Sequence, residues 1–419
     1  MDKEKNNEEY IKIKDEKWVK SHSFYPFIHF QIKYKKYQKI NEKEKEVKTK
    51  IRDLYSSSYI DKSIYKYYGE LLNNKYNNYI KEQDFDEVSI AYRNCKNDKC
   101  NIHYANEVFE FIANSESAYI FVGDFSDFFD GLDHKYLKEQ IRKINLGQPL
   151  SDGEYAVYKN ITRFSYINAR DIEKFKDVPF KDMCELNKYF DTKEFKDFKK
   201  IYLKTNEKGY GVPQGASISS IYANVYMIEF DKILKDYVNK NKGIYRRYSD
   251  DIIIVIPMSK DSTKYCEVRE FVFKTKDKIP NLNLNKDKTS EYFYSNGKII
   301  DLNGKEKSIN YLGFSYDGEY VRIREKSLFK YYCRAYKKTK RIKTFQNKKS
   351  FNAGKKALYR SYTHLGSQPN IYKKYGNFLT YAYKAEKIFN ESKVLKNTIR
   401  NQIKRHWTKI NNRLKINRK

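Results

Sequence analysis

The sequence predicts an α+β fold in which helices pack on an antiparallel sheet. Three observations lead to this prediction: an apolar strand pattern near residue 120, a pair of strands pinched at residues 249–251, and helical segments around them. Their order along the chain is strand, helix, helix, hairpin, helix, strand. Apart from one inserted helix, this is the order of a ferredoxin-like βαββαβ unit, whose helices lie on one face of the sheet.

The first third of the chain has mostly helical character. Residues 1–20 are polar and predict a frayed helix or a tail. Between residues 18 and 120, aromatic side chains recur among charged ones with mostly helical spacing, as in IYKYYGELLNNKYNNYI. The apolar run AYIFVGDF (118–125) then predicts a buried strand that ends at Asp124. Asp133 is expected to be the N-cap of the next helix, which continues to about residue 144.

The central segment supplies the remaining predicted elements. Residues 150–205 have an irregular helical pattern, whereas residues 209–234 begin as a loop rich in Gly and Pro and continue as one long helix. IYRRYSDDIIIVIP (244–257) predicts two β-branched strands joined by a tight turn. A helix, a loop and a strand follow, and INYLGFSYDGEYVRI (309–323) predicts a further hairpin.

Positive charge is concentrated at the C-terminal end. The chain has 85 lysines and arginines against 54 acidic residues, a formal charge of +31. Residues 321–419 alone contain 29 basic residues and only 3 acidic ones. This asymmetry indicates a polyanionic partner, a nucleic acid first and a membrane surface second. The codon bias of an AT-rich genome explains the abundant Lys and Asn, but not the loss of acidic residues after residue 325.

Other compositional features exclude several classes of protein. The 5 cysteines form no CxxC pair and no metal-binding spacing, which favours reduced thiols in the cytoplasm. The charged N-terminal segment lacks the apolar core of a signal peptide. No stretch approaches the apolar length of a membrane-spanning helix, so we expect a cytoplasmic protein with no membrane contact.

Three acidic residues interrupt apolar segments that should be buried. Asp124 ends the strand near residue 120, and Asp250 and Asp251 lie at the tip of the hairpin. Neighbouring carboxylates repel each other unless a cation neutralises them, and oxygen ligands suit Mg²⁺ or Mn²⁺. Two such ions form the known solution for in-line phosphoryl transfer. Because each acid alone is more often a turn or capping residue, the prediction of a two-metal site rests on the combination.

The segments around these acids resemble motifs of reverse transcriptases, and they follow that family's order. Residues 248–251 (YSDD) resemble the YxDD box, and residues 124–130 (DFSDFFD) resemble the first carboxylate motif. The resemblance continues in three further motifs, namely the loop before the nucleotide-binding helix (211–215, GVPQG), the lysine motif (284–289) and the primer grip (311–314, YLGF).

This resemblance spans most of the chain and implies a right-hand polymerase. Its parts would be an N-terminal segment with the fingers (1–117), a palm (118–324) and a basic helical thumb with the C-terminal region (325–419). The palm would contain a helical insertion at about residues 150–205. The thumb would grip the template–primer duplex.

The resemblance also implies roles for individual residues at the metal site. Asp124 and Asp250 would be metal ligands, Asp251 would support the site as a further ligand, and the carbonyl of Phe125 would add a backbone ligand. Asp130 and Asp133 are expected beyond the strand end, in structural roles near the next helix.

Further residues are implied to contact the nucleotide. Phe129 falls at the steric-gate position, where an aromatic ring excludes a 2′-hydroxyl and favours dNTPs; its alternative role is core packing. Gln214 and Gly215 would lie against the sugar and base. Lys288 would protonate or steady pyrophosphate, or is a solvated loop residue. Arg93 would clamp the triphosphate from the fingers, or is a surface arginine.

Two residues, Leu312 and Gly313, are implied to form the primer grip. The implied activity is that of an RNA-directed DNA polymerase that uses two Mg²⁺ or Mn²⁺ ions to add dNTPs to a DNA or RNA primer. The length of the chain and residues 321–338 are similar to bacterial defence-associated, or abortive-infection, reverse transcriptases. Group II intron proteins are the nearest competing subfamily.

The charge of residues 325–419 exceeds the need of a short primer duplex, so we also expect a structured, dedicated non-coding RNA as a partner. A homo-oligomer or a partner protein is left open. Two alternatives to templated DNA synthesis remain at this point. One is a template-independent or protein-primed nucleotidyltransferase on the same palm, and the other is a catalytically silent RNA-binding scaffold.

Overall fold

A five-stranded antiparallel sheet lies at the centre of the fold and carries the acidic residues. The computed structural model describes residues 11–39, 45–96, 98–183, 189–285, 288–368 and 376–415. The strand order of the sheet is β6-β7-β3-β8-β9. These strands are β3 (Ser117–Asp124), β6 (Ile244–Tyr248), β7 (Asp251–Pro257), β8 (Ser290–Ser295) and β9 (Lys298–Asp301).

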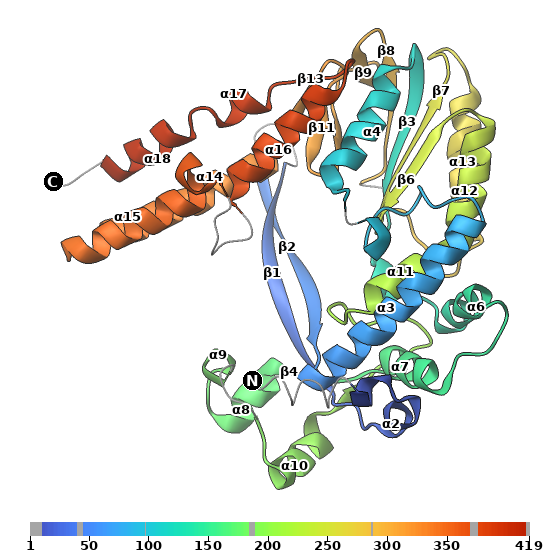
Figure 1. Cartoon of the computed structure of the whole chain (residues 1–419), viewed down its shortest axis with the longest axis vertical. Helices are drawn as coiled ribbons and strands as arrows, with labels where there is room; N and C mark the ends of the chain where they lie inside the picture. Colours follow the sequence, from blue (N-terminus) through green and yellow to red (C-terminus); the bar gives the residue numbers. More distant parts are fainter. Residues whose placement is uncertain are drawn as a thin grey trace.

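Both faces of this central sheet are covered. The helices α12 (Ile228–Lys240) and α13 (Lys264–Asp277) lie along one side, and α4 (Asn101–Ala113) lies along the other (Figure 1). Successive side chains of a strand point to opposite faces. Tyr119 and Phe121 of β3 accordingly pack in one core cluster, whereas Ile120 packs in the other. Burial on both faces explains why β3 and β7 are almost continuously apolar.

The order of the first four palm strands confirms the predicted α+β class with a ferredoxin-like arrangement. β3 is followed by α6 (His134–Ile144), the β6–β7 hairpin, α13 and β8, and the spatial order of these strands is β6-β7-β3-β8. The predicted single helix at the end of residues 209–234 is instead divided into α11 (Ser219–Tyr226) and α12.

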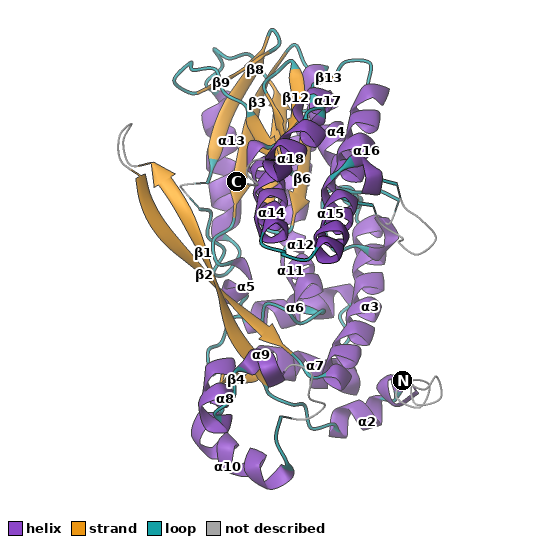
Figure 2. Cartoon of the chain, turned by 90° about the vertical axis from the view of Figure 1, so that its left-hand side faces the viewer, coloured by secondary structure: helices purple, strands orange, loops and turns teal. Residues whose placement is uncertain are grey.

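A long hairpin near the N-terminus is the main feature that the sequence prediction missed. Strands β1 (Phe27–Lys39) and β2 (Lys45–Ser56) pair antiparallel and extend away from the rest of the fingers (Figure 2). The expectation of helical spacing between residues 18 and 120 is therefore wrong here. It holds farther along, where α3 (Tyr59–Glu82) and α4 are both helices.

The hairpin is anchored at its base by a segment far away in the sequence. β4 (Ser165–Asn168) pairs parallel with β1, and β5 (Lys204–Thr205) completes a second sheet of order β2-β1-β4-β5. The remaining helical elements of the first half are α2 (Glu16–Ser21), η1 (Asn94–Lys96), α5 (Phe128–Gly131), α7 (Asp152–Thr162), α8 (Ala169–Lys176), α9 (Phe180–Met183) and α10 (Thr192–Tyr202).

The C-terminal region begins with a small sheet and continues as basic helices. Its strands are β10 (Ile309–Tyr311), β11 (Phe314–Tyr316), β12 (Tyr320–Ile323) and β13 (Lys396–Asn397), so the predicted hairpin is part of a larger meander. The helical elements are α14 (Glu325–Lys343), α15 (Lys348–Tyr362), η2 (His364–Gly366), α16 (Phe378–Glu391), α17 (Ile399–Ile403) and α18 (His406–Lys415).

Two parts of this region differ in where they pack. α14, α15 and α18 extend together away from the palm (Figure 1) and share a small core of their own. α16 instead packs in the same core cluster as α4, so it belongs to the body of the molecule.

Two further expectations concern the thiols and the membrane. Cys95, Cys100, Cys266 and Cys333 are free thiols, as predicted, and Cys184 lies outside the described residues, as do residues 1–10 of the expected tail. Within the described ranges, no helix has both the length and the apolar character needed to cross a bilayer.

Candidate active site

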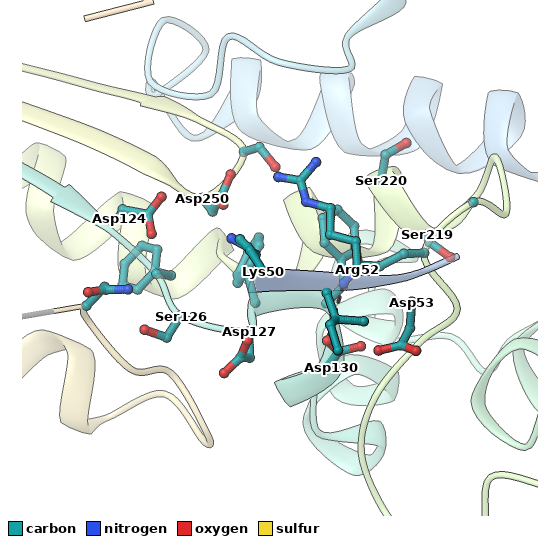
Figure 3. A pocket seen from close by; sticks show the side chains of 18 of the residues that line it. Lys50, Arg52, Asp53, Asp124, Ser126, Asp127, Asp130, Ser219, Ser220 and Asp250 are labelled. Carbon is teal, nitrogen blue, oxygen red and sulfur yellow. Dashed lines mark hydrogen bonds between the residues drawn. The ribbon is translucent and has the colours of Figure 1, made fainter. Parts of the chain in front are cut away.

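Strand pairing brings the three predicted acidic residues together. β3 and β7 are antiparallel neighbours, and their register places Asp124 opposite Asp251. The backbone N–H of Phe125 donates to the carbonyl of Asp250 over 3.0 Å, which fixes the end of β3 against the turn. Ser249 adopts a left-handed conformation with φ of 60°, which makes this turn tight. Asp124 and Asp250 face the same space (Figure 3).

These carboxylates lie at one side of a cavity of about 550 Å³. The cavity is walled by the end of β3, by the loop before α11, by the β6–β7 turn and by strand β2 of the long hairpin. Lys50 and Arg52 reach into it from β2 and lie among the acidic side chains (Figure 3). The long hairpin therefore forms one wall of the cavity.

Burial and mutual repulsion shift the titration of the acidic residues. The pKa of Asp251 is raised to about 7, first by the loss of solvent around its carboxyl group, then by Asp250 and Asp124. The pKa of Asp250 is also raised, by burial and by Asp124, while Lys288 and Arg52 oppose that shift. A raised pKa means that the ionised carboxylates are destabilised while no compensating cation is bound, and shifts of this kind are frequent at functional sites.

The donor set fits a divalent cation in its chemistry. Among the described residues, no group of three or more His, Cys, Asp or Glu side chains is already arranged to hold a metal ion. The ammonium group of Lys288 forms an ion pair with Asp124, so a positive charge occupies one side of the acidic cluster. Oxygen-only ligands of this kind suit Mg²⁺ or Mn²⁺. A metal ion would compete with Lys288 for Asp124.

The predicted sugar and base contacts line the same cavity. Phe129 is partly exposed to it, and the neighbouring Phe128 also contributes to the wall although it is 5% exposed. Gln214 accepts a backbone hydrogen bond of 2.9 Å from Tyr55 of β2. Gly215 has φ of 127°, and a Cβ atom at this position would collide with the Tyr55 carbonyl. Glycine is therefore required where the hairpin meets this loop.

Asp130 is placed differently from the expectation. It lines the cavity and accepts a hydrogen bond of 3.2 Å from the Gln214 amide, so it does not brace the next helix. Burial, Asp127 and Asp53 raise its pKa. Asp133 does have the predicted role, because its side chain accepts the Tyr136 N–H at 2.9 Å and caps α6.

Arg93 does not reach the cavity, and the prediction of a triphosphate clamp is wrong for it. Its side chain is fully buried, so the alternative of a surface arginine is wrong as well. The guanidinium donates to the side chain of Asn77 at 2.7 Å and to the carbonyl of Ser89 at 3.1 Å. It also forms an ion pair with Asp86. The geometry makes Arg93 a structural residue of the 86–93 loop.

Lys50 and Arg52 are the cationic groups that the sequence reasoning missed. Both lie on β2 and line the cavity. A signal for them exists in the sequence, because the segment KTKIRD (48–53) carries a basic residue at every second position. That alternation places basic side chains on one face of a strand. It was not decisive while the segment was interpreted as helical.

The predicted primer grip forms a tight turn outside the cavity wall. Leu312 and Gly313 have φ of 45° and 94° and connect β10 to β11, as expected of a two-residue hairpin turn. The side-chain amide of Asn101 donates to the Leu312 carbonyl at 2.8 Å and to the Tyr381 hydroxyl at 2.8 Å. The turn is thereby tied to α4 and α16.

The fold and the arrangement of carboxylates define a right-hand nucleic-acid polymerase. The chain belongs to the reverse transcriptase (RNA-dependent DNA polymerase) family, whose sequence model matches residues 60–316. A search of curated protein sequences gives no match.

The solved structures that the chain matches include telomerases from two Candida species. Apo telomerase from Candida tropicalis has a TM-score of 0.47 and 13% identity, covering 93% of this chain and 58% of that one. The same enzyme truncated from its C-terminal domain has a TM-score of 0.44 and 14% identity, and the match covers 71% of this chain and 57% of that one. Telomerase from Candida albicans in complex with a fragment of telomeric RNA has a TM-score of 0.41 and 13% identity, and the match covers 98% of this chain and 64% of that one. The chain thus spans less than two thirds of the length of these telomerases.

Proposed function

We propose that the protein is an RNA-directed DNA polymerase that adds dNTPs to a DNA or RNA primer on an RNA template. The observation that carries this proposal is the convergence of Asp124 and Asp250 at a cavity large enough for a nucleotide, with Asp251 opposite Asp124 on the neighbouring strand. Membership of the reverse transcriptase family supports the same activity. The reaction joins the primer 3′-hydroxyl to the α-phosphate of the dNTP, and pyrophosphate departs.

Asp124 and Asp250 would hold a pair of Mg²⁺ or Mn²⁺ ions, with the Phe125 carbonyl as a backbone ligand and Asp251 in support. Bound there, such ions activate the primer hydroxyl and neutralise the triphosphate and the departing pyrophosphate. Lys288 is proposed to leave Asp124 when the ions bind and to contact the phosphates. The ion pair between Lys288 and Asp124 supports this proposal, because it puts the ammonium group within reach of both the carboxylate and a phosphate bound beside it.

Other side chains of the cavity bind and orient the nucleotide in this proposal. Lys50 and Arg52 bind the triphosphate, a role for which arginine and lysine are both suited. Gln214 and Gly215 lie against the sugar and base, and Phe129 excludes the 2′-hydroxyl. This assignment replaces Arg93 with a pair of cations that line the cavity.

Residues outside the cavity hold the nucleic acid. The turn at Leu312 and Gly313 positions the primer end, and α14, α15 and α18 grip the template–primer duplex. The charge of residues 321–419, with 29 basic residues against 3 acidic ones, supports this role. We further propose a dedicated non-coding RNA as template or scaffold, and a role in antiphage defence in the bacterial cytoplasm, supported by the likeness of residues 321–338 to defence-associated enzymes.

The proposed activity is tested by primer extension on an RNA template with the four dNTPs and Mg²⁺. Asp124→Asn and Asp250→Asn are each expected to lower incorporation by at least about 10³-fold, because each removes a carboxylate charge that would hold the metal ions. RNA binding should change little. The matched control is Asp277→Asn, whose carboxylate is 68% exposed and pairs with Lys276.

Undiminished incorporation by either site variant would contradict the site assignment. Incorporation that continues without a template, or a product covalently attached to the protein, would contradict templated extension of a nucleic-acid primer while leaving the site intact.

A further inference from the structure

Tyr92 is an exposed aromatic residue at the cavity that no proposed step has used. It lines the cavity together with Asp250 and Ser249 and is 44% exposed. Its neighbours on both sides are buried, with Ala91 at 2% and Arg93 at 6%. The chain therefore directs one large ring outwards from an otherwise buried loop.

The backbone of Tyr92 is held in a conformation that a tyrosine rarely adopts. Its φ is 61°, in the left-handed region that favours glycine. Non-glycine residues persist there only where the surrounding structure imposes the conformation, and such residues cluster at functional sites. A loop without such constraints would relax to a more favourable φ. The contacts that hold residues 91–93 in place therefore show which part of the structure keeps Tyr92 in this conformation.

Two buried asparagines fix the loop on either side of the ring. The side-chain amide of Asn73, on α3, donates to the carbonyl of Tyr92 itself at 2.8 Å. The amide of Asn224, on α11, donates to the carbonyl of Ala91 at 2.9 Å. Asn73 and Asn224 are 6% and 1% exposed; the bond from Asn224 is buried and the bond from Asn73 is partly buried. These bonds hold the backbone and leave the Tyr92 ring free of the core.

The loop is also joined directly to the turn that carries the acidic residues. The N–H of Ile90 donates to the carbonyl of Arg247 at 3.0 Å, and the N–H of Arg247 donates to Val88 at 2.8 Å. The Arg247 side chain is fully buried and donates to the Ser249 carbonyl at 3.1 Å. The position of Tyr92 is thereby fixed relative to Asp250.

We infer that Tyr92 is a substrate-binding residue whose ring stacks on a nucleobase of the template–primer at the polymerisation site. This inference rests on the proposed function, since it takes the cavity to be the place where template, primer and nucleotide meet. The backbone that carries this 44% exposed ring is already fixed, so little backbone freedom is lost on binding, and every base offers a flat face to the ring. Tyr248 lies near Tyr92: burial raises the pKa of Tyr248, and an electrostatic interaction with Tyr92 raises it further.

The test measures stacking without catalysis. The fluorescent base 2-aminopurine is placed in a template–primer, either as the templating base or at the primer 3′ end, and its quenching is recorded without dNTP or Mg²⁺. Wild-type protein and Tyr92→Phe, which keeps the ring, should quench one of the two positions. Tyr92→Leu should lose that quenching and bind the template–primer about tenfold more weakly. The position that responds identifies which strand the ring contacts.

The matched control is Tyr155→Leu, because Tyr155 is 45% exposed but lies on α7, outside the cavity wall. It should leave quenching unchanged. Tyr92→Gly guards against a folding defect, since glycine accepts the positive φ; it should melt at or above the wild-type temperature and still lose quenching. Full quenching by Tyr92→Leu or by Tyr92→Gly overturns the inference, as does a loss in Tyr92→Phe equal to that in Tyr92→Leu.

The two proposals fail in different ways. If the wild-type protein quenches through Tyr92 but extends no primer, the proposed function fails and the stacking inference stands. If it extends primers with quenching independent of the ring, only the inference fails.

Discussion

At the scale of single residues, the clustered carboxylates at the β6–β7 turn make the stability of the fold depend on pH. The folded-state pKa of Asp251 is about 7, above its ordinary value of 3.8. A group whose pKa is raised by folding stabilises the folded state below its unfolded-state pKa, and this contribution is lost as the pH rises towards the folded-state pKa. In the absence of divalent ions, stability should therefore fall between about pH 4 and pH 7.

Asp251→Asn is expected to remove this dependence. Thermal unfolding at pH 7.5 without divalent ions should show a gain of about 1 kcal/mol over wild type. The value is modest because Asp251 keeps part of its surface in solvent, which screens the repulsion, although its carboxyl group is partly desolvated. The gain should vanish near pH 4, where both proteins carry a neutral group. Added Mg²⁺ should reduce the stability difference between Asp251→Asn and wild type, since cations stabilise the wild-type carboxylates. A gain that persists at pH 4 would contradict this account.

Phe129 is expected to control the choice between deoxy- and ribonucleotides. Phe129→Ala opens the wall of the cavity, so kcat/KM for rNTPs relative to dNTPs should rise by about tenfold or more, the effect of removing a steric clash. The measurement is single-nucleotide extension with paired dNTP and rNTP substrates. Phe128→Ala is the comparison; it should cost about 3 kcal/mol of stability because that ring is buried, without a change in sugar selectivity. If Phe128→Ala alone changed the selectivity between dNTPs and rNTPs, Phe128 and not Phe129 would be the steric gate.

Residues differ in how well the sequence predicts their place. Asp124 and Asp250 could be placed together from the sequence because three acids interrupt apolar segments in the order of the family's motifs, although each acid alone is more often a turn or capping residue. Arg93 was not, because its charge is visible in the sequence whereas its burial against Asn77 and Asp86 depends on tertiary packing. Tyr92 is likewise one of 41 tyrosines until its exposure and backbone conformation are known.

At the scale of elements, the β1–β2 hairpin is expected to position Lys50 and Arg52 so that they bind the triphosphate. Replacing Lys50 and Arg52 with alanine should raise the KM for dNTPs by about tenfold to a hundredfold, because two charge-assisted contacts are lost. The affinity for template–primer should change much less. Steady-state kinetics with varied dNTP, alongside a binding assay for the nucleic acid, separates the two effects.

The same hairpin provides the control. Lys33 of β1 is paired with Ile51, so its side chain lies on the face opposite to Lys50 and Arg52. Lys33→Ala carries a comparable loss of charge on the same element and should leave the KM for dNTPs unchanged. An equal effect of Lys33→Ala would indicate a general electrostatic influence of the hairpin and contradict a direct contact.

The central sheet was predictable as elements because its signals are local. The strands around Asp124 and Asp250 are short, β-branched and bounded by turns, and each was placed from its own residues. The long hairpin was not, because its many charged residues disguise the alternation in FIHFQIKY and because its base pairs with β4, more than a hundred residues away. That pairing is a tertiary contact that no local pattern reports.

At the scale of the whole molecule, the uneven charge should make RNA binding strongly dependent on salt. Helix α14 presents exposed basic residues at helical spacing, among them Lys330, Arg334 and Lys337. Replacing these three with alanine should reduce the slope of log K against log salt concentration by up to about 3, because each lost phosphate contact releases about one counterion fewer. Titration of a labelled template–primer at several salt concentrations measures this slope.

The control changes the net charge equally at other places. Lys66, Lys274 and Lys298 are exposed and each is paired with a nearby glutamate. Their combined replacement by alanine should leave the slope nearly unchanged. If both triple variants reduce it alike, the binding reflects total charge rather than contact with the thumb helices.

The return of the chain from the thumb to the primer-grip sheet has a consequence for shortened forms of the protein. β13 pairs parallel with β12, with Asn397 beside Val321, on the far side of the meander from β10. A chain that stopped before Lys396 would leave β12 as an unprotected border with unpaired amide groups, a template for pairing between molecules. Such truncated chains should therefore form insoluble aggregates. If one of them failed to bind RNA, the cause would be aggregation and not the loss of an RNA-binding surface.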